Sequence, residues 1–192
     1  MSVSSKIFEG LRRNEFRRYF QPSRIALCVL KDPNSGKFNI ITLSFNMHCS
    51  YKPPMMAFAI SKEAFSQELV KLAQYCVLGV PGESLAEETL FCGTHSGREH
   101  DKIKECGLSL LDSETVPVPG ISRSIANIEI EIVNRVPSGD HLTVFGNVLK
   151  YGVNRQNHER CLISVGPDHR GYHVLVSRGI QRIAVPVDAN LA

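Results

Sequence analysis

The sequence of 192 residues lacks any long apolar segment. Its longest purely apolar runs, IALCVL and MMAFAI, are far shorter than the roughly 20 residues that a membrane-spanning helix needs. The N-terminal stretch KIFEGLRRNEFRRYF is basic and amphipathic, and it lacks the continuous apolar core of a secretory signal. These absences predict a soluble, cytoplasmic protein with no membrane partner.

Paired cysteines and glycine-rich phosphate motifs are also missing. The six cysteines are scattered and form no Cys-x-x-Cys pair, so free thiols are expected rather than a disulfide framework. The sequence contains neither a G-x-G-x-x-G nor a Walker glycine pattern. Since regular crossover helices do not separate the predicted strands either, a doubly wound parallel sheet is disfavoured.

The net positive charge lies in the N-terminal segment. The formal net charge is +3, but the residues before Ile25 carry six basic and two acidic side chains, which leaves the rest of the chain close to neutral. We therefore predict a basic arm over residues 1–23 and one domain over residues 24–192, without a nucleic-acid partner. Binding of the arm to a membrane or a nucleic acid is the alternative interpretation.

The clearest periodicity is ANIEIEIVNRV, where Ile128, Ile130 and Ile132 alternate with polar neighbours and predict a half-buried strand. After the turn PSGD, HLTVFGNVLKY returns as its partner. Other strands are predicted over 24–30, 38–45, 55–60, 75–80 and within HVLVSRGIQRIAVPV, and helices over 67–74, capped by Ser66, 83–91 and 100–106. NMHCSYKPP is predicted to be an irregular loop. Six or seven short strands with a few helices favour a small antiparallel barrel.

A polar stretch, FCGTHSGREHDKIKECG, spans residues 91–107. Ser96 and Gly97 could present backbone N–H groups at a helix start, where the dipole favours an anion such as phosphate. Arg98 and Lys102 would lie on one face if that helix begins near Arg98. The alternative is that these cations are solvated and paired with Glu99 or Asp101. The residues alone leave both interpretations open.

The sequence supports a metal site or a catalytic nucleophile less well than an anion site. The series Cys92, His95, His100 and Cys106 matches no standard zinc spacing, so no metal is expected. His48 adjoins Cys49, but no orienting acid is evident, and we predict no catalytic side chain. His141, in a hairpin turn, is interpreted as structural or solvent-facing.

Five motifs follow one another in a characteristic order. They are N-x-x-T-x-S-F (from Asn39), S-x-x-P-P (from Ser50), an apolar strand ending at Ser61, CG-x-x-SGR-x-x-DK (from Cys92), and GDH before VFGNV (from Gly139). In this order the sequence resembles the flavin reductase-like family, the FMN-binding split barrels, and within it the flavoredoxin-like branch. It departs from that branch at Ile103, where Phe is usual, and in the middle of NIITLSF.

The resemblance implies a mainly β fold with some helix, a six-stranded antiparallel split β-barrel with peripheral helices, assembled as a homodimer. It implies FMN as cofactor, NADH or NADPH as hydride donor, and an electron acceptor that could be a redox-partner protein. A non-enzymatic FMN electron carrier and a pyridoxamine-phosphate oxidase-like enzyme are the alternatives. The cofactor contacts would come from Asn39, Thr42, Leu43, Ser44, Phe45, Asn46, Ser50, Ser61, Lys62, Ser96, Gly97, Arg98 and Lys102.

In this picture Arg98 and Lys102 neutralise the phosphate, and Ser96 with the Gly97 N–H binds it by hydrogen bonds. The strand and loop over residues 39–46 border the isoalloxazine ring, with backbone N–H groups near N5 and O4. Ser61 and Lys62 reach the ribityl chain or the phosphate. The C-terminal 45 or so residues carry no motif that indicates a function.

Overall fold

The computed structural model describes residues 20, 22–164, 173–177 and 184–188. The chain divides into two compact units, one of residues 24–163 and the other of residues 1–23 and 164–192. Most of the predicted basic arm, residues 1–19 and 21, lies outside the described residues. In the second unit, β12 (His173–Ser177) and β13 (Ala184–Asp188) form an antiparallel pair, where the sequence indicated one strand and an irregular tail.

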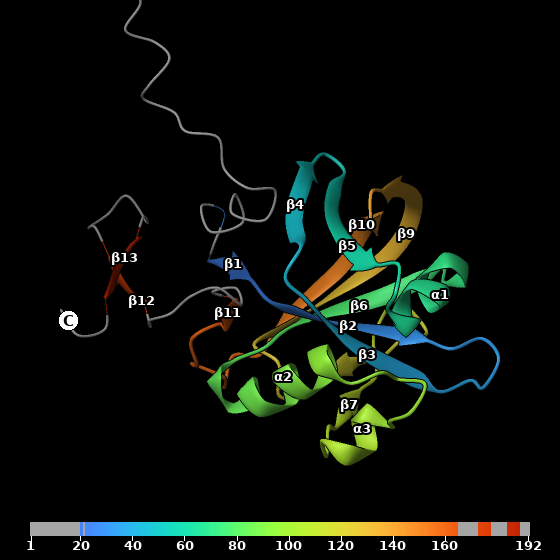
Figure 1. The fold of residues 1–192 in the computed structure, drawn as a ribbon, viewed down its shortest axis with the longest axis horizontal. Helices are drawn as coiled ribbons and strands as arrows, with labels where there is room; N and C mark the ends of the chain where they lie inside the picture. Colours follow the sequence, from blue (N-terminus) through green and yellow to red (C-terminus); the bar gives the residue numbers. More distant parts are fainter. Residues whose placement is uncertain (1–19, 21, 165–172, 178–183, 189–192) are drawn as a thin grey trace, which may run out of the picture. The chain divides into compact units, whose positions relative to one another are not determined.

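A seven-stranded antiparallel sheet forms the frame of the unit of residues 24–163 (Figure 1). Its order is β3-β2-β6-β9-β10-β5-β4, which confirms a mainly β, split-barrel architecture. The strands of this sheet are β2 (Ala26–Lys31), β3 (Phe38–Leu43), β4 (Asn46–Tyr51), β5 (Pro54–Ser61), β6 (Tyr75–Val80), β9 (Ala126–Ser138) and β10 (His141–Val153). The shorter strands are β1 (Ser23–Arg24), β7 (Leu110–Leu111), β8 (Gly120–Ile121) and β11 (Ile163–Ser164).

Hydrophobic clusters cover both faces of this sheet, which explains why β2 is almost entirely apolar. Cys28 and Leu30 of β2 belong to one cluster, and Leu27 and Val29, which point to the opposite face, belong to the other. Helix α1 (Phe65–Leu72) packs on the first cluster. The second lies beneath η2 (Glu83–Leu85), α2 (Ala86–Thr94) and α3 (Lys102–Glu105), and Figure 1 shows α2 and α3 beside β3.

Strand β6 connects the two halves of the sheet, because it pairs with β2 on one side and with β9 on the other. Both pairings join residues far apart in the chain, as in Leu27 with Gly79 and Tyr75 with Glu131. A Cβ atom on Gly79 would lie 2.7 Å from the Ser124 hydroxyl, so this position needs a residue without a side chain.

The prediction of a loop over NMHCSYKPP is wrong, because Asn46–Tyr51 forms β4 and pairs with β5. A bulge between His48 and Ser50 interrupts this pairing. β4 is the outermost strand of the sheet and most of its side chains are exposed, so it needs no apolar alternation. This strand raises the number in the barrel sheet from the expected six to seven.

The predicted helices exist, but their ends differ from the prediction. Ser66 lies inside α1, whose N-cap is Ala64 and has no side-chain capping bond. Ser66 instead accepts a hydrogen bond of 2.8 Å from the Asn39 amide. The third helix begins at Lys102, capped by Asp101, and Gly107 with its φ of 59° follows it as predicted.

Strand β9 alternates as predicted, with one exception at Glu129. This side chain is buried, and its carboxylate accepts hydrogen bonds from the N–H groups of Glu114 and Thr115. Burial alone would raise the pKa of Glu129, but the bonds from Thr115 and Glu114 outweigh it and lower the pKa. An ionised Glu129 therefore holds the segment after β7 against the sheet.

Candidate functional site

The first candidate region is the bend between β3 and β4, where the sheet is split. The two strands are consecutive in the chain yet lie at opposite ends of the sheet order, and within the described residues no strand pairs with their outer edges. The Asn46 amide donates to the carbonyl oxygens of Leu43 at 3.1 Å and Arg24 at 3.0 Å, which fixes the bend. The Ala59 N–H donates to the Phe45 carbonyl at 2.9 Å and attaches the bend to β5. The bend therefore combines a fixed shape with backbone groups that the sheet does not use.

A shallow, mostly apolar pocket of about 230 Å³ lies beside this bend. Phe45 is 46% exposed at its edge, although it is a large aromatic side chain. Small side chains on β5 keep the pocket open. It is lined by Phe45, Asn46, Met47, Ala57, Phe58, Ala59 and Thr143. A flat aromatic ligand would find both apolar contact and backbone donors here.

The turn between β9 and β10 lies beside the bend between β3 and β4. The His141 ring lies 5.3 Å from the Phe45 ring, and its Nδ1 lies 2.7 Å from the Asp140 carboxylate. The hydrogen bond with His141 lowers the pKa of Asp140, so this carboxylate stays ionised beside the imidazole. Lys62 fixes the turn through its Nζ, which donates to the Gly139 carbonyl at 2.5 Å.

The interpretation of His141 as structural or solvent-facing did not include its contact with Phe45. Only the contact with Phe45, nearly a hundred residues earlier in the chain, brings the imidazole to the bend. The available signal was the Gly-Asp-His turn itself, which is one of the five motifs that carry the family resemblance.

The second candidate region is the start of α1 together with Arg98. The helix begins without a side-chain cap, so its first-turn N–H groups have no side-chain acceptor. The guanidinium carbon of Arg98 lies 5.2 Å from the centroid of the Phe65 ring, and Arg98 also pairs with Glu68. Helix dipole and guanidinium together make this the most favourable position for an anion among the predicted site residues.

Gly97 sets the position of Arg98. A Cβ atom at Gly97 would lie 2.1 Å from the Asn39 side-chain oxygen, so the backbone packs directly on that amide. The other end of the Asn39 amide donates to Ser66 in α1. Asn39 is buried, and through these two contacts it links β3, α1 and the turn of Arg98.

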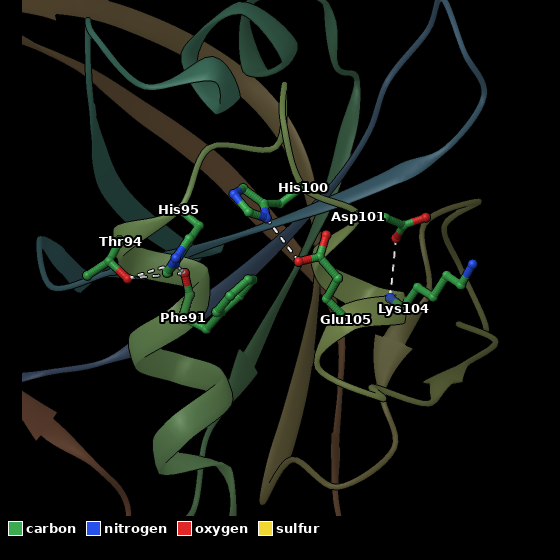
Figure 2. Close-up of polar contacts among 7 residues, drawn as sticks. All are labelled: Phe91, Thr94, His95, His100, Asp101, Lys104 and Glu105. Carbon is green, nitrogen blue, oxygen red and sulfur yellow. Dashed lines mark hydrogen bonds and ion pairs between the residues drawn. The ribbon is translucent and has the colours of Figure 1, made fainter.

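The expectation that Ser96 and Gly97 begin a helix is wrong. They lie in a turn in which the Ser96 carbonyl accepts the N–H groups of Glu99 at 3.1 Å and His100 at 3.0 Å. Figure 2 shows how this turn is supported from both ends. His95 stacks on Phe91 with 3.9 Å between ring centroids, and His100 Nδ1 lies 2.9 Å from the Glu105 carboxylate.

Lys102 is not the exposed cation that the sequence interpretation required. It is 4% exposed, and its Nζ donates to the carbonyl oxygens of Ile40 at 2.9 Å and Cys92 at 2.8 Å. Burial lowers the pKa of Lys102, although the neighbouring thiols oppose this. Because α3 begins at Lys102, Arg98 and Lys102 do not share a helix face. Lys102 ties α2 and α3 to β3.

The other predicted contacts fall into separate places. Thr42 points toward α2 and donates to the Thr89 carbonyl at 2.5 Å, and Leu43 is buried in the core. Ser44 lies in the bend, and Ser61, at the end of β5, accepts the Glu63 N–H at 3.3 Å. Ser50 lies just beyond the bulge of β4.

The two candidate regions lie at opposite ends of β3. Asn39 and Ser44 are five residues apart along this strand and its bend, which corresponds to about 16 Å. An elongated ligand with an aromatic end and an anionic end could reach from one region to the other.

No three His, Cys, Asp or Glu side chains in the described part of the chain converge as metal ligands would, although His95 and His100 lie in contact. None of the helices described is long and apolar enough to cross a membrane.

The sequence matches the model of a known family over residues 17–174, described as "Flavin reductase like domain". It is also 32% identical over 133 residues to an uncharacterized protein of Archaeoglobus fulgidus, covering 68% of this chain and 72% of that protein.

The fold is similar to those of several solved structures. An FMN-binding protein from Thermus thermophilus superposes with a TM-score of 0.71 at 20% identity, covering 84% of this chain and 91% of the other. A flavoredoxin from Methanosarcina acetivorans gives a TM-score of 0.69 at 19% identity, covering 78% and 76%. An NADH:FAD oxidoreductase of Streptomyces globisporus gives 0.69 at 16% identity, covering 83% and 92%. These likenesses concern the fold, and the match of the family model carries the assignment. The chain therefore belongs to the flavin reductase-like family of flavin-linked oxidoreductases.

Proposed function

We propose that this protein binds FMN and reduces it with NADH or NADPH, passing the electrons to a separate acceptor. The observation that carries the proposal is the arrangement at the two ends of β3. An open apolar pocket with backbone donors lies at one end, and an uncapped helix start with Arg98 lies at the other. A flavin mononucleotide has a flat apolar ring and a dianionic phosphate, so its two ends match these two regions.

The ring would lie against the bend between β3 and β4. Leu43, Ser44, Phe45 and Asn46 would border it, with backbone N–H groups directed at its polar edge. Bound flavin supplies a ring that accepts a hydride at N5. This chain orients that ring and places donors where negative charge gathers on reduction. His141, whose Nδ1 lies beside the Asp140 carboxylate, is close enough to Phe45 to offer a hydrogen bond at the pocket edge.

The phosphate would lie at the start of α1, bound by Arg98 and by the first-turn N–H groups. Ser61 and Lys62 lie on the short segment that leads from β5 into this helix, so we retain them as contacts to the ribityl chain. The backbone around the site would be positioned by Ser96, Gly97, Asn39 and Thr42. Lys102 would hold α2 and α3 against β3. Ser50 pairs with Met55 beyond the bulge, away from the pocket at the start of β4, and stays a proposed contact that the resemblance alone suggests.

A phosphate-dependent affinity tests this proposal. We expect FMN to bind at least tenfold more tightly than riboflavin, since a charge-assisted hydrogen bond to phosphate contributes about 1.5–3 kcal/mol. Titration of the apoprotein by flavin fluorescence quenching measures both affinities. Equal affinities would contradict the phosphate assignment, and absence of binding to either flavin would contradict the function.

We also propose a homodimer, because large apolar side chains are exposed on one part of the sheet. Met47 and Tyr51 of β4 and Tyr151 of β10 are among them, and Tyr51 is 84% exposed. A mostly apolar pocket of about 440 Å³ lies beside them, lined by His48, Pro54, Met56, Ile128, Val148, Leu149, Lys150 and Tyr151. Contiguous exposed apolar surface of this kind is typical of protein interfaces.

Sedimentation should give about twice the chain mass of 21.3 kDa. The variant Tyr151→Glu places a charge on this surface and should shift the protein toward the monomer, whereas Lys31→Glu, exposed on β2, should not. A wild-type monomer that still binds FMN would refute the homodimer while leaving the flavin site intact.

A further inference from the structure

The side-chain amide of Asn39 lies buried where three segments of the chain meet. Asn39 is on β3 and only 7% exposed, and its amide nitrogen donates at 2.8 Å to the hydroxyl of Ser66 in the first turn of α1. Its amide oxygen packs against the backbone of Gly97, in the turn that carries Arg98. Because a buried amide without a partner is costly, the hydrogen bond to Ser66 favours one fixed separation of β3 and α1.

Gly97 is needed for this close approach rather than for an unusual backbone conformation. It is not among the described glycines with a positive φ, so an alanine could adopt the same backbone angles. A Cβ atom there would nevertheless overlap the Asn39 amide oxygen, and it would lie 3.1 Å from a ring carbon of Phe65. The missing side chain therefore lets the turn approach β3 and α1 until it touches the buried amide.

Arg98 follows Gly97 directly, and its side chain leads to the same turn of α1. Its guanidinium carbon lies 5.2 Å from the centroid of the Phe65 ring, and the guanidinium pairs with Glu68. Both partners of this ion pair are about half exposed, so the pair holds the side chain only weakly. The contact of Gly97 with the buried amide is the firmer constraint on where Arg98 lies relative to the first-turn N–H groups of α1.

We infer that Asn39 is a positioning residue, which gives the site its selectivity for a flavin that carries a phosphate. Its amide would set the distance from Arg98 to the start of α1, so that the guanidinium and the N–H groups converge on one anion. Such convergence has to be accurate to about 0.5 Å for the hydrogen bonds to form together. Asn39 would act only through Arg98, because both ends of its buried amide already contact protein atoms. This inference rests on the proposed function, because it concerns the phosphate of the flavin proposed there.

Titrations of Asn39→Ala with FMN and riboflavin test the inference. We expect FMN binding to weaken about tenfold, because Arg98 and the start of α1 no longer converge, while riboflavin affinity stays within about twofold. In an Arg98→Ala background the same substitution should weaken FMN binding by less than about twofold, since the group through which Asn39 acts is absent. Gly97→Ala should repeat both results, because its Cβ atom displaces the turn from the same amide, and it supplies the comparison if Asn39→Ala does not fold.

Asn127→Ala is the matched control for the loss of a buried amide contact. The Asn127 amide holds another glycine-containing segment in a similar way. It bonds the N–H and the carbonyl of Ile121, each at 3.0 Å, and a Cβ atom on Gly120 would lie 2.6 Å from its amide carbon. Asn127 is on β9 and lines a different pocket from those of the two candidate regions. Its replacement should lower stability but leave the ratio of the FMN and riboflavin affinities unchanged.

Three results would overturn the inference and leave the proposed function standing. Equal weakening of FMN and riboflavin in the folded Asn39→Ala protein would mean that the amide supports the whole site. An unchanged ratio of the two affinities would mean that Arg98 is positioned without it. A tenfold loss of FMN affinity that persists in the Arg98→Ala background would mean that Asn39 acts by another route. A wild type that binds neither flavin, or both equally, would instead contradict the proposed function or its phosphate assignment, and this inference with it.

Discussion

Replacement of Lys102 by Met should lower the free energy of unfolding by about 2–4 kcal/mol. Its ammonium group donates to two carbonyl oxygens, of Ile40 and Cys92, in a place that water does not reach. Methionine keeps an unbranched chain of similar length but leaves both oxygens without this donor, and each buried polar group left unpaired costs about 1–3 kcal/mol. Part of this loss is offset, because the ammonium no longer has to be buried. Urea unfolding followed by circular dichroism measures the difference.

Lys104→Met is the matched control for this experiment. Lys104 lies two residues further along α3 and is exposed, so its replacement should change stability by less than about 0.5 kcal/mol. The FMN affinity of the folded Lys102→Met protein decides whether Lys102 binds the phosphate or only stabilises the packing of α2 and α3 on β3. A large loss of FMN affinity with unchanged stability would restore the phosphate contact that the sequence indicated, and it would contradict the bracing role.

Replacement of Arg98 by Ala should weaken FMN binding ten- to a hundredfold while the fold remains intact. The expected loss of about 1.5–3 kcal/mol is that of a charge-assisted hydrogen bond to phosphate. Stability should change little, because the pair of Arg98 with Glu68 is half exposed, with side-chain exposures of 49% and 57%, and such pairs contribute about 0–1 kcal/mol. Riboflavin has no phosphate, so its affinity should stay within about twofold. Fluorescence titrations with both flavins provide the comparison.

Glu68→Ala provides a second arm of this experiment. It frees Arg98 from its carboxylate partner, so FMN should bind equally well or more tightly than in the wild type. If Arg98→Ala leaves FMN affinity unchanged, the phosphate does not lie at the start of α1. That result would remove the proposed phosphate contact. It would not bear on the proposed ring site at the bend, because the affinity for riboflavin measures that site directly.

Much of the fold could be predicted because local patterns specify it. The alternation of Ile128, Ile130 and Ile132 and the apolar run of β6 lie in strands as expected. β4 was missed because it is an exposed edge strand, whose residues Asn46–Tyr51 show no apolar pattern. The start of α1 was misplaced because Ser66 fits a cap by residue type, whereas its hydroxyl is bound by Asn39, 27 residues earlier in the chain.

The candidate site was predicted less well than the fold, since its geometry depends on distant contacts. The residue types around Arg98 indicated an anion, but Lys102 was assigned the same role although it is buried against Ile40. That burial depends on the packing of α3 on β3, which spacing in the sequence does not reveal. His141 was set aside for the same reason, because its neighbour Phe45 lies on another strand.

The central place of β6 has a consequence for how fast the chain folds. The hairpins β2–β3 and β9–β10 close short loops, whereas β6 joins them through pairs such as Leu27 with Gly79, about fifty residues apart. Such non-local pairing must overcome loop-closure entropy before it gains contacts, and folds of this kind form in milliseconds to seconds rather than microseconds. Substitutions in β6 should therefore slow refolding in stopped-flow experiments more than substitutions of equal cost in β4, whose partner β5 is its neighbour in the chain.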